Sequence, residues 1–263
     1  MRRHFIAIFL IFILALSLAA CTGPGSEGTS IKSGCEADSW KDRPKSEMIL
    51  AGKLVRFYDG SFILAGADSS ELYRFSPEVK VYDPKNRAVR SEYLKAGQNV
   101  EIGYSGLILE SYPAQIGTPV YVKVNSQGDD MVGFYQSILN DLWNVDPGLN
   151  PDTGVLAFDL TAVENLNEAE KAALIFSMSR EHNLADISGT FEELSEQGYI
   201  DREKLYFEKG MLFSFELSDV KEDSFTFNVR KWRSGTGAFF FYDCKAVKTD
   251  GVWSYTVGGE MIS

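Results

Sequence analysis

Residues 213–257 have the sequence FSFELSDVKEDSFTFNVRKWRSGTGAFFFYDCKAVKTDGVWSYTV. Apolar side chains repeatedly occupy alternate positions, which is the period of a β-strand with one buried face. An Asp-Gly pair at Asp250-Gly251 is typical of a tight turn between two antiparallel strands. The stretch therefore predicts an antiparallel meander of four strands, over residues 213–217, 225–229, 238–247 and 252–257.

Helices are predicted upstream of the meander, because three residue pairs have the pattern of helix N-terminal caps. Asp129 and Asp130 precede a run whose apolar residues recur at helical spacing: Met131, Tyr135, Ile138 and Leu142. The other two caps are Asn167 with Glu170 and Thr190 with Glu193, and a strand is predicted at Val155–Leu160. Helices on an antiparallel sheet make an α+β domain, at 129–263. Its ending is similar to the cystatin-like and nuclear-transport-factor-like cones.

Residues 47–125 show only the strand period. Val100, Ile102 and Tyr104 alternate with polar residues or glycine, and Asp59-Gly60 predicts a hairpin. Five or so short strands separated by turn residues favour a small all-β barrel. We therefore expect a mixed protein, with a small barrel at 47–125 followed by the α+β domain.

Two segments of this first unit carry a resemblance. They are Gly97–Ile102 (GQNVEI) and Ile108–Ile116 (ILESYPAQI), and the Glu-Ser-Tyr-Pro-Ala-Gln string is the specific part. The stretch resembles a small OB-like domain of envelope lipoproteins of low-GC Gram-positive bacteria, over about a third of the chain. The resemblance implies a fold and a location, and it implies no chemistry.

The N-terminus predicts where the protein is sent. Arg2 and Arg3 precede the apolar segment Phe5–Ala20, in which only Ser17 is polar. This segment is shorter than the roughly 20 residues of a membrane-spanning helix and suits a signal peptide, at 1–20. It ends in Leu18-Ala19-Ala20-Cys21, which resembles the bacterial lipobox. The resemblance implies cleavage before Cys21, acylation of its thiol, and a mature protein held by lipid on the extracytoplasmic face of the cell membrane.

The amino-acid composition limits which classes of partner the protein can bind. The region 21–46 is rich in Gly, Ser and Thr and cannot build a core, so we interpret it as a flexible lipidated linker. The chain has 26 basic and 37 acidic residues, a net charge of −11. Such an acidic protein is repelled by phosphate backbones, which argues against nucleic acid as a partner.

Three cysteines are present. Cys21 is the expected lipidation site, and there is no Cys-x-x-Cys motif. A disulfide between Cys35 and Cys244 suits an oxidising envelope. The alternative is a buried, reduced Cys244 that packs as a small apolar residue. We favour the second interpretation and leave the first open.

No catalytic constellation is recognisable. Of the two histidines, His4 lies in the leader and His182 lies near the end of a predicted helix. The one Ser-x-x-Lys of the mature chain, Ser218–Lys221, falls at a predicted strand end instead of opening a helix. Asp146, Asn150 and Asp152 offer oxygen ligands, but their spacing departs from that of a calcium loop. We predict no catalytic residues, no metal and no cofactor.

The candidate binding residues lie in the cationic turn of the meander, at 230–237. Arg230, Trp232, Arg233, Ser234 and Gly235 combine guanidinium groups, an indole and a flexible backbone in an acidic protein. Arg and Trp often dominate binding surfaces, although a long hairpin turn with a packed Trp232 explains the same residues. We expect a non-enzymatic lipoprotein that binds or senses a protein or small-molecule partner. The alternative is an envelope hydrolase that uses a carboxylate pair.

Overall fold

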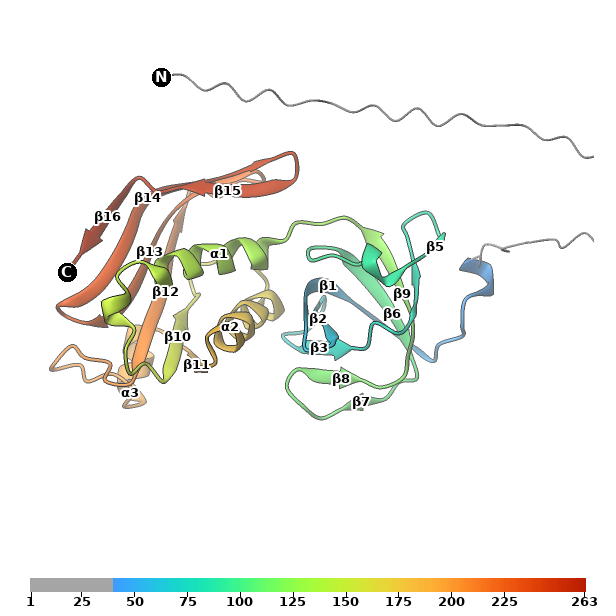
Figure 1. Ribbon diagram of the computed structural model, residues 1–263, viewed down its shortest axis with the longest axis horizontal. Coiled ribbons are helices and arrows are strands. Elements are labelled where there is room, and N and C mark those ends of the chain that lie inside the picture. Colours follow the sequence, from blue (N-terminus) through green and yellow to red (C-terminus); the bar gives the residue numbers. More distant parts are fainter. Residues whose placement is uncertain (1–39) are drawn as a thin grey trace, which may run out of the picture. The chain divides into compact units, whose positions relative to one another are not determined.

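The computed structural model describes residues 40–263 (Figure 1). The predicted signal peptide, Cys21, Cys35 and most of the predicted linker lie outside the described residues. The described part is rich in β-strand, with some helix, as expected for a mixed fold. Within it, no helix has the length and apolar character needed to cross a membrane.

Nine strands form the first sheet, in the order β5-β4-β9-β6-β1-β2-β3-β8-β7, and it curls into a half-barrel (Figure 1). They are β1 (Met48–Tyr58), β2 (Ser61–Gly66), β3 (Leu72–Phe75), β4 (Lys80–Tyr82), β5 (Ala88–Val89), β6 (Asn99–Tyr104), β7 (Ile108–Leu109), β8 (Ala114–Ile116) and β9 (Pro119–Ser126). Three 3₁₀ turns lie outside the two sheets, at Trp40–Asp42, Ser91–Tyr93 and Pro147–Leu149.

The predicted hairpin at Asp59-Gly60 is confirmed. Both residues have positive φ, 46° and 73°, which a tight two-residue turn between twisted strands requires. The concave side of the sheet encloses its own core, in which Leu54, Leu64 and Ile102 are almost fully buried. The alternation of apolar residues is thus explained by burial of one face of each strand.

Seven strands form the second sheet. Six follow the order β11-β10-β12-β13-β14-β15, and β16 pairs with β14. They are β10 (Val155–Asp159), β11 (Ala185–Ser188), β12 (Gly210–Ser218), β13 (Ser224–Ser234), β14 (Gly237–Thr249), β15 (Val252–Thr256) and β16 (Gly259–Ile262). The predicted meander is confirmed as β12 to β15.

The expectation of a wholly antiparallel second sheet is wrong. β10 runs parallel to both of its neighbours, β11 and β12. The reason is that helix α2 (Glu168–His182) connects β10 to β11, and a crossover through a helix returns the chain in the same direction. The sheet is therefore mixed, with a parallel edge joined to an antiparallel meander.

All three predicted helix caps are confirmed. Asp130 caps α1 (Met131–Asn144) by accepting a hydrogen bond from the backbone N–H of Gly133 at 2.9 Å. Capping boxes open α2, through Asn167 and Glu170, and α3 (Phe191–Glu196), through Thr190 and Glu193. Each cap satisfies backbone N–H groups that have no partner within the helix.

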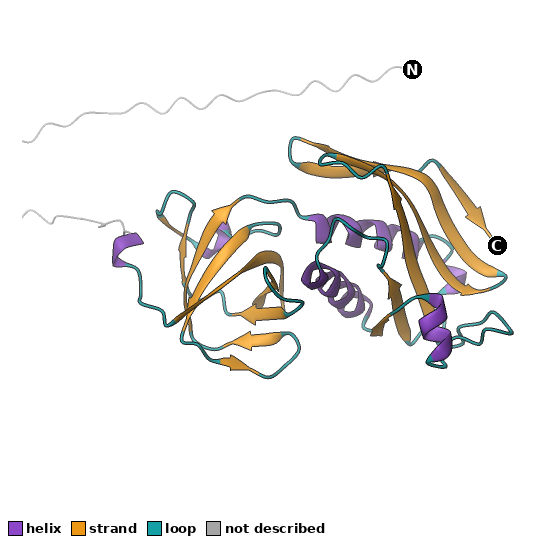
Figure 2. Cartoon of the chain, turned by 180° about the vertical axis from the view of Figure 1, so that it is seen from behind, coloured by secondary structure: helices purple, strands orange, loops and turns teal. Residues whose placement is uncertain are grey.

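The helices cover both faces of the second sheet (Figure 2). On one face, α1 packs its buried Tyr135 against the rings of Phe215 and Phe225, at centroid distances of 5.2 and 5.9 Å. On the other face, Leu194 of α3 packs in a smaller cluster that includes Leu212 of β12. Neighbouring strand residues point to opposite faces, so a single sheet supports both clusters.

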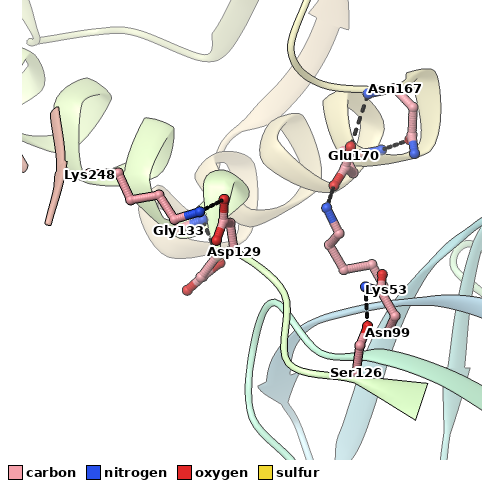
Figure 3. A network of polar contacts seen from close by, with 9 residues as sticks. Lys53, Asn99, Ser126, Asp129, Gly133, Asn167, Glu170 and Lys248 are labelled. Atoms are coloured by element: carbon pink, nitrogen blue, oxygen red, sulfur yellow. Dashed lines mark hydrogen bonds and ion pairs between the residues drawn. The ribbon is translucent and has the colours of Figure 1, made fainter. Parts of the chain in front are cut away.

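The first sheet and α2 are also in contact. Lys53 of β1 forms an ion pair with Glu170, the same carboxylate that closes the capping box with Asn167 (Figure 3). Four apolar residues of the first sheet lie in the same buried cluster as the residues of α1 and α2: Val55, Ile63, Ala65 and Leu72.

Candidate functional site

A cavity lies at the carboxyl ends of the parallel strands β10 and β11. Its volume is about 710 Å³, and we call it the strand-end cavity. Carboxyl ends of parallel strands are where open α/β sheets place their ligands, because the chain leaves the sheet there in loops. The lining residues are Ser70, Phe158, Asp159, Leu160, Thr161, Glu168, Lys171, Ala172, Ile175, Ser188, Gly189, Glu193 and Gln197.

Local hydrogen bonds shape the loops around this cavity. At the end of β10, one carboxylate oxygen of Asp159 accepts hydrogen bonds from the backbone N–H and the hydroxyl of Thr161, at 3.2 and 2.6 Å. Beyond β11, the N–H of Gly189 donates to the carbonyl of Phe158 at 3.0 Å. The first contact closes a turn directly after β10, and the second ties the chain after β11 to the end of β10.

Three carboxylates line the strand-end cavity, and each already has a partner. Asp159 is bound by Thr161. Glu168 forms an ion pair with Lys171, with 3.0 Å between nitrogen and oxygen. Glu193 accepts from the N–H of Thr190 at 2.8 Å in the capping box of α3. In residues 40–263 no group of three His, Cys, Asp or Glu side chains is arranged to hold a metal ion.

The cavity combines polar rims with apolar walls. The apolar part comes from Phe158, Leu160 and Ile175, and the polar part adds the hydroxyls of Thr161 and Ser188 to the carboxylates. Carboxylate and hydroxyl oxygens accept hydrogen bonds, and apolar walls favour the C–H surface of a ligand. This lining suits a small molecule that carries several hydroxyl groups.

The structure separates the five candidate residues of the cationic turn. Arg230 lies on the sheet face away from α1, and its Nε donates to the hydroxyl of Ser214 at 2.6 Å. It borders a shallow cavity of about 180 Å³ whose lining also includes Phe240, Tyr242 and Met261. Of the five, Arg230 alone lines either this cavity or the strand-end cavity.

The other candidates have contacts within the fold. Trp232 is half-buried, with its ring 5.2 Å from that of Phe191 in α3. The guanidinium of Arg233 donates to the backbone carbonyls of Leu149, Pro151 and Glu208. Ser234 and Gly235 form the hairpin, where the N–H of Gly235 donates to the carbonyl of Leu205 at 2.9 Å. Arg233 therefore holds loops together through its charged group.

Lys231, which lies between Arg230 and Trp232 in the sequence, is fully buried. Its Nζ donates to the carbonyls of Trp143, Val145 and Asp146 and to the side-chain oxygen of Asn150. Burial lowers the pKa of this lysine to about 8. Lys231 therefore binds the loop that contains Asp146 and Asn150, through the Asp146 backbone carbonyl and the Asn150 side chain.

His182 and Cys244 both have structural surroundings. The His182 ring nitrogen Nε2 lies 2.9 Å from the side-chain oxygen of Asn140, and burial lowers its pKa. Cys244 is a free, fully buried thiol in the core, and burial raises its pKa to about 11. Its proposed disulfide partner, Cys35, lies outside the described residues.

Sequence reasoning missed the strand-end cavity. A usable signal was present, because Val155–Leu160 is followed by the capping box at Asn167. A strand followed by a capped helix indicates a crossover, and its loop lies at the carboxyl edge of a sheet. The second strand of the crossover, β11, carries no such signal, since its sequence is Ala-Asp-Ile-Ser.

No family model matches the sequence, and the comparison with curated proteins finds no significant match.

Proposed function

We propose that this protein is a lipid-anchored lipoprotein of the extracytoplasmic face of the cell membrane that binds a small, hydroxyl-rich ligand in the strand-end cavity without transforming it. The lipobox at Cys21 supports the location. The two acyl chains of one diacylglycerol suffice for stable anchoring without a spanning helix. The strand-end cavity supports the binding role, because its size is that of a small-molecule site.

We infer the finer fold types from the same pattern. The half-barrel of β1 to β9 supports the OB-like assignment for 47–125. The long strands β13 and β14 packed on α1 support the cystatin-like assignment for 129–263. Both fold types present sheet surfaces and end loops to ligands, so they agree with a binding role and specify no ligand.

Binding is favoured over catalysis by the partners of the carboxylates. A general acid or base must be free to exchange a proton with the substrate. Asp159 and Glu193 instead accept hydrogen bonds that shape a turn and a helix cap, and Glu168 is neutralised by Lys171. These contacts tie Asp159 to a turn, Glu193 to a helix cap and Glu168 to a neighbouring side chain of the same helix.

A hydrolase is the second candidate, because the three carboxylates lining one cavity include pairs of the kind that a glycoside hydrolase uses. The two functions differ in what Asp159→Asn does. In a hydrolase the change abolishes turnover, whereas in a binding protein it weakens affinity and there is no turnover to lose.

Thermal unfolding in the presence of N-acetylglucosamine and of glucose tests the proposal. Saturating sugar at a hundredfold excess over Kd should add about 2.7 kcal/mol to the free energy of unfolding. Ala172→Phe, which fills the cavity from α2, should remove the effect, and Ala185→Phe on the exposed start of β11 should preserve it.

If the protein hydrolyses p-nitrophenyl glycosides and Asp159→Asn abolishes this activity, the protein is a hydrolase and the binding proposal is wrong. If sugar stabilises the Ala172→Phe and Ala185→Phe variants equally, the strand-end cavity is not the binding site.

A further inference from the structure

A second cavity lies where the first three strands meet the end of α2. Its volume is about 230 Å³, and we call it the arginine pocket. The lining residues are Tyr58, Asp59, Ser61, Ile63, Arg74, Tyr112, Pro113, Phe176 and Arg180. It shares no lining residue with the strand-end cavity, so a role for this pocket is independent of the proposed function.

Strand register brings two arginines to one face beside this pocket. Arg56 of β1 is paired with Ile63 of β2, and Ile63 is paired with Arg74 of β3. Residues directly opposite each other on neighbouring strands project from the same face of a sheet. Arg56 and Arg74 therefore flank Ile63 on the face that the pocket occupies.

Both arginines carry a buried donor without a partner in the part of the chain that the structure describes. These are Nη1 of Arg56 and Nε of Arg74. Arg74 also donates from Nη2 to the side-chain oxygen of Gln115 at 3.2 Å, and no carboxylate within residues 40–263 forms an ion pair with either arginine. A buried, unpaired guanidinium donor is costly, so an acceptor from outside the chain would stabilise this arrangement.

A second lining arginine, Arg180, and two tyrosines also line the pocket. Arg180, in the last turn of α2, is exposed and lies with its guanidinium carbon 5.3 Å from the centre of the Phe176 ring. Tyr58 and Tyr112 meet the same ring edge-on, each at 5.9 Å. The phenol groups are further hydrogen-bond donors, and Arg180 stands at the solvent side of the lining.

One carboxylate, Asp59, also lines the pocket. Two lining guanidinium groups against one carboxylate leave the lining net positive, in a protein whose total charge is negative. Asp59 accepts hydrogen bonds, so it favours an anion that itself bears an O–H or N–H group.

We propose that the arginine pocket binds a small oxyanion. Half-buried Arg74, through its buried Nε, is the inner ligand, and Arg180 contacts the anion from the solvent side. Guanidinium groups match carboxylate and phosphate oxygens in geometry, and hydrogen bonds of this kind are stronger than neutral ones. Phosphate and carboxylate share this chemistry, and the hydrogen phosphate ion also supplies an O–H for Asp59.

Isothermal titration calorimetry of the purified protein with inorganic phosphate, and separately with acetate, tests the assignment. Saturable binding is expected for at least one of the two anions. Arg74→Gln and Arg180→Gln should each weaken it by about tenfold or more, since each removes charged hydrogen-bond donors. Arg202→Gln, at an exposed arginine outside the lining, is the matched control and should leave the affinity unchanged.

The two titrations distinguish the sources. Binding of phosphate alone identifies a phosphate site, and binding of acetate with a similar dependence on Arg74 identifies a carboxylate site. The absence of binding to both anions, or affinities that Arg74→Gln and Arg180→Gln leave unchanged, would overturn the proposal. Arg180→Gln lies on an exposed helix end and keeps the test valid if Arg74→Gln fails to fold.

Discussion

Replacement of Lys231 by Met should change how the stability of the protein depends on pH. The lysine is fully buried, and its Nζ donates to backbone carbonyls in the last turn of α1 and just after it. Met has a similar length and carries no donor, so Lys231→Met leaves three backbone carbonyls without their charged partner. At pH 7 we expect the variant to be less stable by about 2 kcal/mol, from the cost of leaving buried acceptors unsatisfied.

The difference should grow as the pH rises. Burial lowers the pKa of Lys231 from 10.5 to about 8, so between these values the unfolded chain holds a proton that the folded chain has released. Stability rises with pH wherever the unfolded state binds more protons. The 2.5 pH units between 8 and 10.5 correspond to roughly 3 kcal/mol, which the parent gains and the Met variant does not.

Urea unfolding at several pH values between 7 and 10 measures this difference. Subtraction of the variant from the parent cancels the titration of all other groups. Lys245→Met, at an exposed position of the adjacent strand β14, is the control and should track the parent at every pH. A difference that stays constant or shrinks with pH would refute the reasoning, since it would mean that the carbonyls stabilise the ammonium more than burial destabilises it.

Two further predictions concern the anchor and the cationic turn. Cys21→Ser should release the protein from membranes or leave it unprocessed, as measured by fractionation and by mass spectrometry of the N-terminus; an unmodified mature N-terminus at another residue would contradict it. Arg233→Ala should lower the free energy of unfolding by about 2 kcal/mol, because it removes donors to three carbonyls. Arg230→Ala should have a smaller effect, because Arg230 donates to one side chain. Equal losses of stability in urea unfolding would show that Arg233 does not hold these loops together.

Local chemistry made the helices and the meander predictable. The caps at Asp130, Asn167 and Thr190 are satisfied by backbone groups within three residues, so the sequence nearby contains the whole interaction. The Asp59-Gly60 and Asp250-Gly251 turns are local in the same sense. Each of these predictions is confirmed.

The parallel edge of the second sheet and its last strand, β16, were not predictable in the same way. β11 has one apolar residue besides its first alanine, Ile187, and β16 begins with Gly259, so neither strand shows the alternation that identifies a buried strand. Their pairing depends on where the chain returns to the sheet, which is a property of the tertiary fold. The strand-end cavity depends on the crossover through α2, of which the sequence signals the first strand and the helix cap but not the second strand, β11.

The burial of Lys231 could have been predicted from the alternation of buried and exposed residues along its strand. It continues the alternation of Phe225, Phe227 and Val229, all of which face α1. That parity indicated a buried lysine, whereas charge alone suggested an exposed cationic surface. Arg230 and Trp232 have the opposite parity and lie on the other face, so the five candidates could not form a single site.

The buried cluster shared by the two sheets lies between the two cavities and includes residues of α2. Val55 and Ile63 of the first sheet lie in the same apolar cluster as Phe176 of α2. Helix α2 also lines both cavities, with Ile175 in one and Phe176 in the other. If a ligand in one cavity shifts α2, it will also change the free energy of binding in the other cavity, and by thermodynamic linkage that effect would be equal in both directions.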